Sequence, residues 1–546
     1  MPKAEAQKLK VFQAVARSLK DQGAETMFGL MGQANMFMAD SYVRDCGGQF
    51  VAAANEAGAA FMALGYSLIS GKPGICTVTA GPAVTNTITA VVEGVKGSIP
   101  MVLLCGDMGV EDWEHHQKIE QLPFMAAAGA GFERLKSPTT VGADIARAFR
   151  RAMLEQRPIA LNLPIDFDWS DTNYQAVPRI QLPEFRTVIT ESRDLDNAVG
   201  IIAAAKRPLI VAGRGATSSA ARAALLRLAK RIESPIATTL KAKDLFRGEP
   251  LDLGLFGTLS SPAAVDIIME SDCIIAVGAS LNYRTTSRKT FLHGKRLVQI
   301  SLDGAEIGKF VQPDVGLVGD AAKTADLLVH WLDEAEIAPS GFGSEELVRK
   351  IARSKMTAAN ETADYGDGTV NYRAALRRLN DALPADRVLV TDAGRFMDAA
   401  CTILSVPNPG AYINTTNFGS IGMAFSHAIG AAFASAGRPV VVVMGDGGFM
   451  HSGLAEFNTA VRYGLDLIIV IANDSAYGSE VDLFKKRQVD PSASFFQWPE
   501  FSPLANTLGG KGVVVRSEGD FKVVEQAIRA RKGPLLIDLK LNSDRL

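Results

Sequence analysis

The sequence has no excess of charge of either sign and few cysteines, and both features narrow what the protein can be. Its 546 residues contain 57 Lys and Arg against 59 Asp and Glu, so the formal net charge is −2. That balance gives no reason to expect nucleic acid or a membrane surface as a partner. The five cysteines form no C-x-x-C pair and no metal-binding spacing, which predicts buried thiols in a reducing cytoplasm.

Leader-like and membrane-spanning segments are also missing. The first residues, Met1 to Ala6, are polar and run into an amphipathic stretch, so we expect no signal peptide. The apolar runs have the length of a strand or are interrupted by glycine, so we expect no transmembrane helix. Together these features predict a cytoplasmic protein.

The chain does contain a long alternation of strand-like and helix-like segments. At 546 residues it is too long for a single hydrophobic core, and three domains are expected. Alternating strands and helices predict an α/β protein of three doubly wound parallel sheets. Polar and Pro-rich linkers around 166–185 and 338–343 set the predicted domains at 1–185, 190–336 and 350–546.

The most informative motif is Gly445-Asp446-Gly447-Gly448, at the end of a Val-rich strand-like segment. The next such segment ends in Asn473-Asp474. The carboxyl ends of parallel strands open on the same edge of a sheet, so the oxygen ligands can converge there. Asp and carbonyl oxygens suit Mg²⁺, and glycines let backbone N–H groups approach a diphosphate closely. The sequence therefore predicts a metal–diphosphate site.

This arrangement resembles the signature of thiamine diphosphate (ThDP) enzymes, which is Gly-Asp-Gly followed about one βα unit later by Asn-Asn. The resemblance implies that the Asp, the second Asn and a carbonyl two residues further on hold the metal. Counting from Asp446 by the common spacing gives Asn473, whereas counting back from Tyr477-Gly478 gives Asp474 with the carbonyl of Ala476. The stretch 450–456 looks one residue longer than the pattern, and we therefore favour Asp474.

A second set of motifs, near the N-terminus, resembles the pyrimidine-binding domain of the same enzymes. It consists of E-x-G-A-A beginning at Glu56, then G-K-P-G, then T-x-G-P. The resemblance implies that Glu56 bonds the aminopyrimidine ring and promotes deprotonation of the thiazolium carbon. It also implies cofactor contacts at Thr79, Pro82 and Asn86. In this family opposite subunits supply the two halves of each site, so a homodimer or homotetramer is implied.

Several further positions have both a functional and an ordinary explanation. Gln33 ends a turn that resembles F-G-x-P-G-x, and its amide can exchange hydrogen bonds but is no useful general acid. His115 and His116 could relay protons near neutral pH, and Gln117 lies where these enzymes carry an active-site glutamine. Each of these four residues could equally be a solvated loop residue.

The last third of the chain adds three elements of the resemblance. Ile421 lies in a G-x-Φ-G turn that starts at Gly419, and it would bend the cofactor into a V shape. The turn Asp392-Ala393-Gly394 resembles a phosphate turn in which Arg395 and Phe396 replace the common Gln and His, and Arg395 could pair with a phosphate. Glu480 resembles a glutamate that decarboxylases use to handle protons. The remaining implied cofactor contacts are Gly394, Phe396, Gly419, Gly445, Gly447, Gly448, Asn473, Tyr477 and Gly478.

The middle third resembles the FAD-holding domain of acetohydroxyacid synthases at Gly213-Arg214-Gly215, and it could hold FAD, ADP or no cofactor. Three departures argue against acetolactate synthesis itself. The stretch 124–129 lacks Arg and Lys, Ile421 replaces a Met, and the chain stops soon after its last strand-like segment. The short end leaves no C-terminal lid, which also argues against a CoA ester.

These features predict a ThDP- and Mg²⁺-dependent lyase or transferase that acts on a small carbonyl substrate, a 2-oxo acid or an α-hydroxy ketone. The implied chemistry is decarboxylation or carboligation through an enamine, with no nucleic acid or membrane involved. Two alternatives stay open: an acetolactate synthase proper with FAD, and an inactive binding or regulatory subunit of the same fold. Retention of Glu56, Asp446 and Asp474 argues against the inactive subunit.

Overall fold

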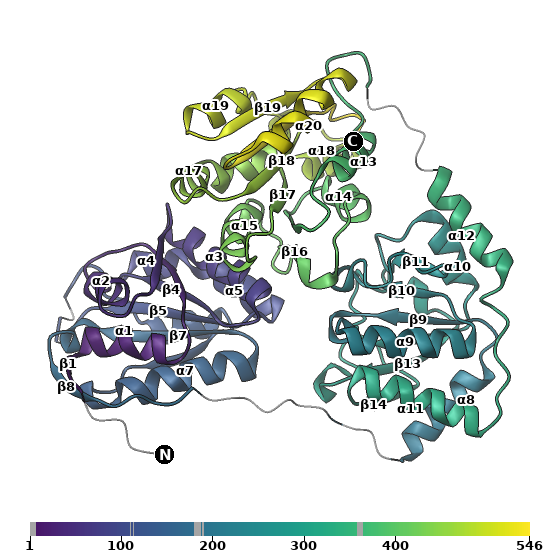
Figure 1. Ribbon diagram of the computed structural model, residues 1–546, viewed down its shortest axis with the longest axis horizontal. Helices are drawn as coiled ribbons and strands as arrows, with labels where there is room; N and C mark the ends of the chain where they lie inside the picture. Colours follow the sequence, from purple (N-terminus) through teal and green to yellow (C-terminus); the bar gives the residue numbers. More distant parts are fainter. Residues whose placement is uncertain are drawn as a thin grey trace.

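The computed structural model has three lobes, each built on one six-stranded sheet (Figure 1). It describes residues 7–109, 111–112, 114–179, 187, 191–357 and 364–545. Neighbouring strands within each of these sheets pair in parallel, and helices alternate with the strands. The predicted α/β class with three parallel sheets is therefore confirmed. Among the described residues, no helix is long and apolar enough to cross a bilayer.

The N-terminal sheet has the strand order β3-β2-β4-β5-β7-β6. Its strands are β2 (Thr26–Gly29), β3 (Gln49–Ala52), β4 (Gly74–Val78), β5 (Met101–Asp107), β6 (Gly131–Arg134) and β7 (Pro158–Pro164). Its helices are α1 (Val11–Asp21), α2 (Met36–Arg44), α3 (Glu56–Ser70), α4 (Pro82–Asn86), α5 (Ile88–Gly97), α6 (Gln121–Ala127) and α7 (Val141–Glu155). A short antiparallel pair, β1 (Gln7–Lys10) with β8 (Asp171–Tyr174), joins the two ends of this lobe.

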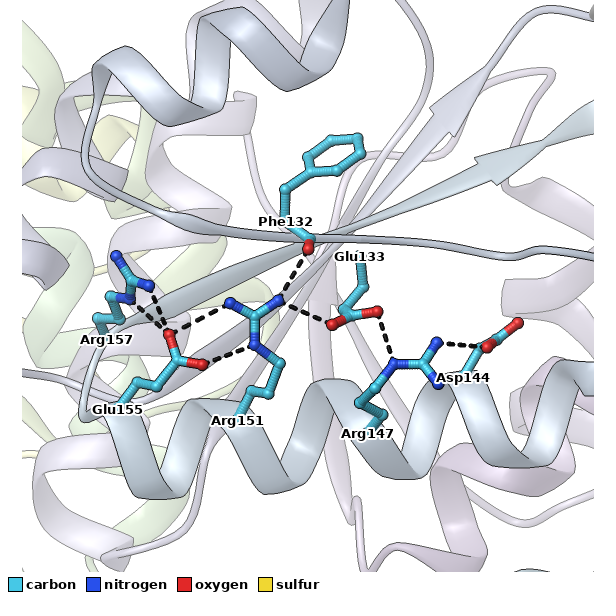
Figure 2. A network of polar contacts seen from close by, with 7 residues as sticks. All are labelled: Phe132, Glu133, Asp144, Arg147, Arg151, Glu155 and Arg157. Carbon is cyan, nitrogen blue, oxygen red and sulfur yellow. Dashed lines mark hydrogen bonds and ion pairs between the residues drawn. The ribbon is translucent and has the colours of Figure 1, made fainter.

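The edge strand β6 is held to α7 by a chain of ion pairs (Figure 2). Glu133 on β6 accepts from Arg147 and from Arg151 at 2.7 Å each, and Arg151 also bonds Glu155. Arg157 extends the chain from Glu155 to the carbonyl of Gly129. Because Glu133 is largely buried, its negative charge depends on these two guanidinium groups.

The C-terminal sheet has the order β16-β15-β17-β18-β20-β19. Its strands are β15 (Val388–Thr391), β16 (Tyr412–Asn414), β17 (Val440–Gly445), β18 (Leu467–Asn473), β19 (Lys511–Val515) and β20 (Leu535–Lys540). Its helices are α13 (Tyr372–Ala382), α14 (Met397–Ile403), α15 (Met423–Ala434), α16 (Asp446–Gly448), α17 (Leu454–Arg462), α18 (Gly478–Lys486), α19 (Phe501–Thr507) and α20 (Phe521–Ala530). Numbered within each lobe, this order is the same as in the N-terminal sheet.

The middle sheet has a different order, β11-β10-β9-β12-β13-β14, which is the classic dinucleotide-binding arrangement. Its strands are β9 (Pro208–Ala212), β10 (Ile236–Thr238), β11 (Asp252–Leu255), β12 (Cys273–Val277), β13 (Arg296–Ser301) and β14 (Val315–Val318). Its helices are α8 (Arg193–Ala204), α9 (Ser219–Ile232), α10 (Pro262–Glu270), α11 (Ala321–Glu334) and α12 (Glu345–Thr357).

The predicted domain boundaries stay predictions. The first boundary, 185–190, lies outside the described residues apart from Thr187. Near the second boundary, Leu347 and Ile351 of α12 pack in the core of the middle sheet. This helix therefore extends the middle lobe past the expected start of the third region at 350.

Helices α3 and α15 join the N- and C-terminal lobes through main-chain contact. A Cβ atom on Gly65 would lie 2.1 Å from the carbonyl oxygen of His427, and one on Gly430 would lie 1.8 Å from that of Met62. These reciprocal contacts require an antiparallel helix pair with a local pseudo-twofold axis. One continuous hydrophobic core, including Met62 and Phe425, runs across both lobes.

Candidate active site

The carboxyl ends of β17 and β18 bring two buried carboxylates together. Asp446 accepts a hydrogen bond from its neighbour Gly447 N at 2.9 Å and another from Trp498 Nε1 at 2.9 Å. Burial first, and the charge of Asp474 second, raises the pKa of Asp446 to about 7. Burial also raises the pKa of Asp474, and the guanidinium of Arg395 opposes that rise. Two such groups side by side favour a cation between them.

Asn473 and Asp474 point to different partners. The amide of Asn473 donates to Asp538 at 2.9 Å, and Asp538 is also paired with Lys540. Asp474 instead belongs to the loop that faces Asp446, with Ala476 two residues further on. This arrangement supports Asp474 over Asn473 as the second metal ligand, which remains a prediction.

The extra residue expected between Asp446 and Asp474 coincides with a π-helical turn at Phe449–Gly453. A π-turn holds one more residue than an α-helical turn without moving the flanking helix, and it is common near functional sites. Beyond the π-turn, α17 continues with the ordinary helical period. The turn therefore gives a structural reason why the two ways of counting to the second ligand differ by one residue.

Glycines line the floor beside the two carboxylates. Cβ atoms on Gly447 and Gly448 would lie 2.3 Å from the Tyr477 ring and 2.6 Å from Asp392 Oδ2, so no larger residue fits at either position. Gly419 has a φ of +89° with open space around it, and Gly422 has a φ of +79°. Gly447 and Gly448 are buried, whereas Gly419 is exposed and leaves its main chain open to a ligand such as a diphosphate.

Asp392 holds the turn that carries Ile421. Its carboxylate accepts from Gly422 N at 2.7 Å and from Ala424 N at 3.4 Å, at the start of α15. Burial raises the pKa of Asp392 to about 7, although these N–H donors lower it. The sequence motif contained this residue, but the prediction assigned a role to Gly394, Arg395 and Phe396 and none to Asp392.

Trp498 was missed from sequence. It lies shortly after Phe495-Phe496, and Phe495 pairs with Ala476 in an isolated antiparallel bridge. The Phe496 ring stacks on Trp498 with centroids 4.7 Å apart and meets Tyr477 at 4.6 Å. The available signal was an aromatic run after the loop 474–477, which follows β18 and is called the metal loop below.

The N-terminal half of the candidate site centres on Glu56. Asn55 caps α3 by accepting from Gly58 N at 2.7 Å, which places Glu56 in the first turn of the helix. Asn86 donates from its amide to Glu56 Oε2 at 3.0 Å, so two predicted residues are brought into contact. Glu56 is half-buried and Asn86 is exposed.

Six other predicted residues gather at the same edge of the N-terminal sheet. Thr79 accepts from Ala34 N at 3.2 Å, which places it beside Gln33. The main chain of Gln117 lies against Gly81, the residue before Pro82. His115 and His116 stack with ring centroids 4.5 Å apart, and His115 Nδ1 accepts from Gln117 N at 3.2 Å.

Two further predicted residues, Arg395 and Glu480, lie beside and on α18. Arg395, expected at a phosphate, pairs with Asp474 and with Asp482 on α18. Glu480 lies exposed in the first turn of α18.

The N- and C-terminal lobes each supply one buried glutamate that bonds the main chain beside the half-site of the other lobe. Glu456 on α17 accepts from Ala54 N at 3.0 Å, just before Glu56. Glu93 on α5 accepts from Phe418 N at 2.6 Å, just before Gly419. The two helices occupy equivalent places after the third strand of their lobes, so the ties are reciprocal.

Within one chain the two half-sites lie at opposite ends of the α3–α15 pair. Because Met62 faces Gly430 and Gly65 faces His427, the start of α3 is level with the end of α15. At 1.5 Å per residue, Glu56 and Ile421 are separated by roughly 20 Å along the helix axes. A single chain therefore does not bring Glu56 to the glycine-lined floor.

The donor set fits a hard cation that is shared with a bound diphosphate. The described residues contain no cluster of three or more His, Cys, Asp or Glu side chains suited to a metal. Two carboxylates and the carbonyl of Ala476 leave positions for water and phosphate oxygens, which Mg²⁺ commonly retains. The residues present therefore fit a metal bound together with a diphosphate.

The middle lobe offers weaker signs of a cofactor. Gly213 and Gly278, at the ends of β9 and β12, touch through their main chains, and Gly213 N donates to Val277 O at 2.8 Å. Arg214 donates to Gly97 O of the N-terminal lobe at 2.7 Å. Burial lowers the pKa of the nearby Lys241 to about 8.

Comparison with known proteins covers all three lobes. Residues 9–127, 195–328 and 392–539 match the N-terminal TPP-binding, central and C-terminal TPP-binding domains of thiamine pyrophosphate enzymes. Similar proteins include a probable 2-ketoarginine decarboxylase of Pseudomonas aeruginosa, 28% identical over 97% of this chain and 93% of the relative. An acetolactate synthase of Mycobacterium bovis is 28% identical (98% and 89%). A sulfoacetaldehyde acetyltransferase of Castellaniella defragrans is 27% identical (95% and 90%).

Proposed function

Because the chain belongs to the thiamine pyrophosphate enzymes, we propose that it breaks or forms a carbon–carbon bond next to a carbonyl, using a 2-oxo acid or an α-hydroxy ketone. As a member of this family it is a ThDP-dependent enzyme of the decarboxylase or transferase kind. The observation that carries the proposal is the retention of both half-sites, Glu56 with Asn86 and Asp446 with Asp474.

When bound, ThDP supplies a thiazolium carbon that adds to a carbonyl and accepts an electron pair. Glu56, held by Asn86, would bond the aminopyrimidine ring. Asp446, Asp474 and the carbonyl of Ala476 would hold Mg²⁺, and Ile421 would set the bend of the cofactor. Gln33, His115, His116, Gln117 and Glu480 would hold or move protons at the substrate.

We also propose that two copies of the chain share each site. The separation of Glu56 from Ile421 along the helix pair supports this, because another copy can supply the missing half. Mixing two inactive variants tests it directly. Glu56→Gln and Asp446→Asn, co-expressed, should regain activity, since one site in each mixed dimer keeps both wild-type halves. Activity that stays at the level of the separate variants would refute a shared site.

The reaction is tested with a panel of substrates. The relatives are named for decarboxylation, acetolactate synthesis and acetyl transfer, so we expect one of these outcomes. Purified protein with ThDP and Mg²⁺ should release CO₂ or an aldehyde from at least one 2-oxo acid or acyloin. No turnover of any panel member, together with no uptake of ThDP, would favour the inactive-subunit alternative.

The second candidate is acetolactate synthase proper with FAD. The strand order of the middle sheet and the cations Arg214 and Lys241 beside its strand ends favour a nucleotide there. The absorbance spectrum of the purified protein tests this, because bound flavin absorbs visible light and protein side chains do not. Acetolactate formed from pyruvate would establish the activity.

A further inference from the structure

Arg395 is the most heavily bonded cation at the candidate site. Its Nη2 donates to Asp474, to Ser543 O at 2.9 Å and to Ser543 Oγ at 2.6 Å, and its Nη1 donates to Asp482 at 2.8 Å. The Arg395 side chain is 12% exposed and that of Asp474 is 7% exposed. One guanidinium therefore joins the metal loop, helix α18 and the C-terminal segment.

The space for this guanidinium is built into the fold. A Cβ atom on Gly478 would lie 2.1 Å from Arg395 Nε, so a larger residue at the start of α18 would displace the arginine. Arg395 Nε is buried and finds no acceptor among the described residues. The unpaired Nε–H group carries a desolvation cost. Another interaction of the guanidinium must therefore offset this cost.

The positive charge of Arg395 is needed because two buried carboxylates lie next to each other. Asp474 and Asp446 are neighbouring buried carboxylates, and a buried charge without a partner is strongly unfavourable. In the resembled pattern the equivalents of Asp474 and Arg395 are Asn and Gln, both uncharged. In this chain the first position carries a negative charge and the second a positive one, so the two charges cancel.

We propose that Arg395 is a positioning residue that carries the counter-charge of Asp474, and that the two residues act as one coupled pair in binding the divalent cation. The proposal rests on the proposed function for the identity of the cation and diphosphate. It gives Arg395 a role different from that of a phosphate ligand. Its two bonds to Ser543 set where the metal loop lies relative to the C-terminal segment.

A double-variant cycle tests the pair through Mg²⁺ affinity, measured with ThDP present by titrating the fluorescence of Trp498, which contacts Asp446. Asp474→Asn alone should weaken Mg²⁺ binding about 10- to 100-fold, because the site loses a negative charge and keeps a positive one. Adding Arg395→Gln should recover most of that loss. Arg395→Gln alone should leave Mg²⁺ affinity unchanged or tighter.

The cofactor-free protein gives a second measurement of the same pair. Arg395→Gln should lower the melting temperature by roughly 3–6 °C, since it leaves a buried carboxylate unpaired, and the double variant should melt higher than this single variant. Asp482→Asn is the matched control, because Asp482 bonds the same guanidinium from an exposed position, 56% accessible. Asp482→Asn should change Mg²⁺ affinity by less than about threefold, because an exposed ion pair contributes little free energy.

Two outcomes would overturn the proposal. Additive effects of Arg395→Gln and Asp474→Asn in both measurements would show that the residues act separately. Weaker ThDP and Mg²⁺ binding in Arg395→Gln, not recovered in the double variant, would make Arg395 a phosphate ligand. If the wild-type protein takes up neither ThDP nor Mg²⁺, the proposed function fails, and the melting temperatures of the cofactor-free variants still decide the pair.

Discussion

The N- and C-terminal sheets have the same strand order and differ in where each places its acidic groups. In the N-terminal lobe the carboxylate opens the helix after the second strand, at Glu56. In the C-terminal lobe the carboxylate follows the third strand, at Asp446. The offset that relates Met62 to His427 and Gly65 to Gly430 also relates Glu56 to Ile421. One architecture therefore carries a glutamate in one copy and an isoleucine at the equivalent place in the other.

The edges of the two sheets differ as well. Strand β6 is tied to α7 by the ion pairs of Figure 2, whereas β19 is covered by α19 through a main-chain contact at Gly512, where a Cβ atom would lie 2.2 Å from Ser502 O. The reciprocal glutamates Glu93 and Glu456 are, by contrast, alike in both lobes. The shared features hold the lobes together, and the features that differ lie at the candidate site and at the edges.

Glu56→Gln should break the comparison most strongly. The amide keeps the shape but cannot take up a proton, so turnover should fall about 10²- to 10⁴-fold while ThDP still binds. Turnover with saturating ThDP, and calorimetric titration of the cofactor, measure the two effects. Glu25→Gln is the control, because Glu25 is an exposed residue of the same lobe paired with Lys72. Wild-type turnover in Glu56→Gln would contradict the assignment.

Asp392→Asn should remove a pH dependence of stability that comes from a buried carboxyl group in the C-terminal lobe. The pKa of Asp392 is about 7 in the folded protein and ordinarily 3.8. Between pH 3.8 and 7 the folded protein therefore keeps a proton on this carboxyl group that the unfolded chain has lost. Asp392 therefore makes stability fall as pH rises from 4 to 7, by about 4 kcal/mol at most. Urea unfolding of the cofactor-free protein at pH 5 to 8 gives the free energy of unfolding at each pH. This free energy should fall less steeply with rising pH in the variant than in the wild type. An unchanged slope would rule Asp392 out as its source.

Gly430→Ala should separate the two lobes' helices. The added Cβ meets the carbonyl oxygen of Met62 at 1.8 Å, so the helices must move apart, at a cost of about 3 kcal/mol. Gly200→Ala provides the control, since Gly200 is an exposed helical glycine with nothing within 4 Å. That change should stabilise by roughly 0.5–1 kcal/mol. Thermal unfolding distinguishes them, and equal shifts would mean that the contact is unimportant.

Glu133→Gln should give the smallest effect and sharpen the comparison of the edges. Two arginines lose their shared anion, and we expect a loss of about 1–2 kcal/mol that shrinks in high salt. Arg150→Ala on the same helix is exposed and should change stability by less than about 0.5 kcal/mol. A loss independent of salt would indicate that packing, and not charge, holds β6.

Sequence patterns predicted the fold class, which is confirmed, and both half-sites, which stay predictions, because both kinds of pattern depend on local order. Strand periodicity predicts parallel sheets, and Glu56 and Asp446 lie in short motifs with fixed neighbours. The patterns did not give Trp498, Asp482 or Ser543, which reach the site from loops and a helix after the metal loop. They also did not give the ion pair of Arg395 with Asp474, because each residue belongs to a different motif.

The position of the second metal ligand shows the same limit in another way. The two counts along the sequence end at different residues, Asn473 and Asp474, because each count starts from a different landmark. The side-chain partner of Asn473, Asp538, lies on β20 and becomes visible when β18 and β20 pair. Information of this kind is carried by the sheet and is absent from any single segment.

The π-turn at Phe449–Gly453 has a practical consequence for recognising such proteins. A search pattern with a fixed gap between Gly-Asp-Gly and the predicted second ligand would end at Asn473 here, one residue before Asp474. Patterns anchored on landmarks at both ends, with an elastic gap inside the helix, would find both ligands. One more residue in this helix than the common spacing has is thus enough to hide such a motif from a search with a fixed gap.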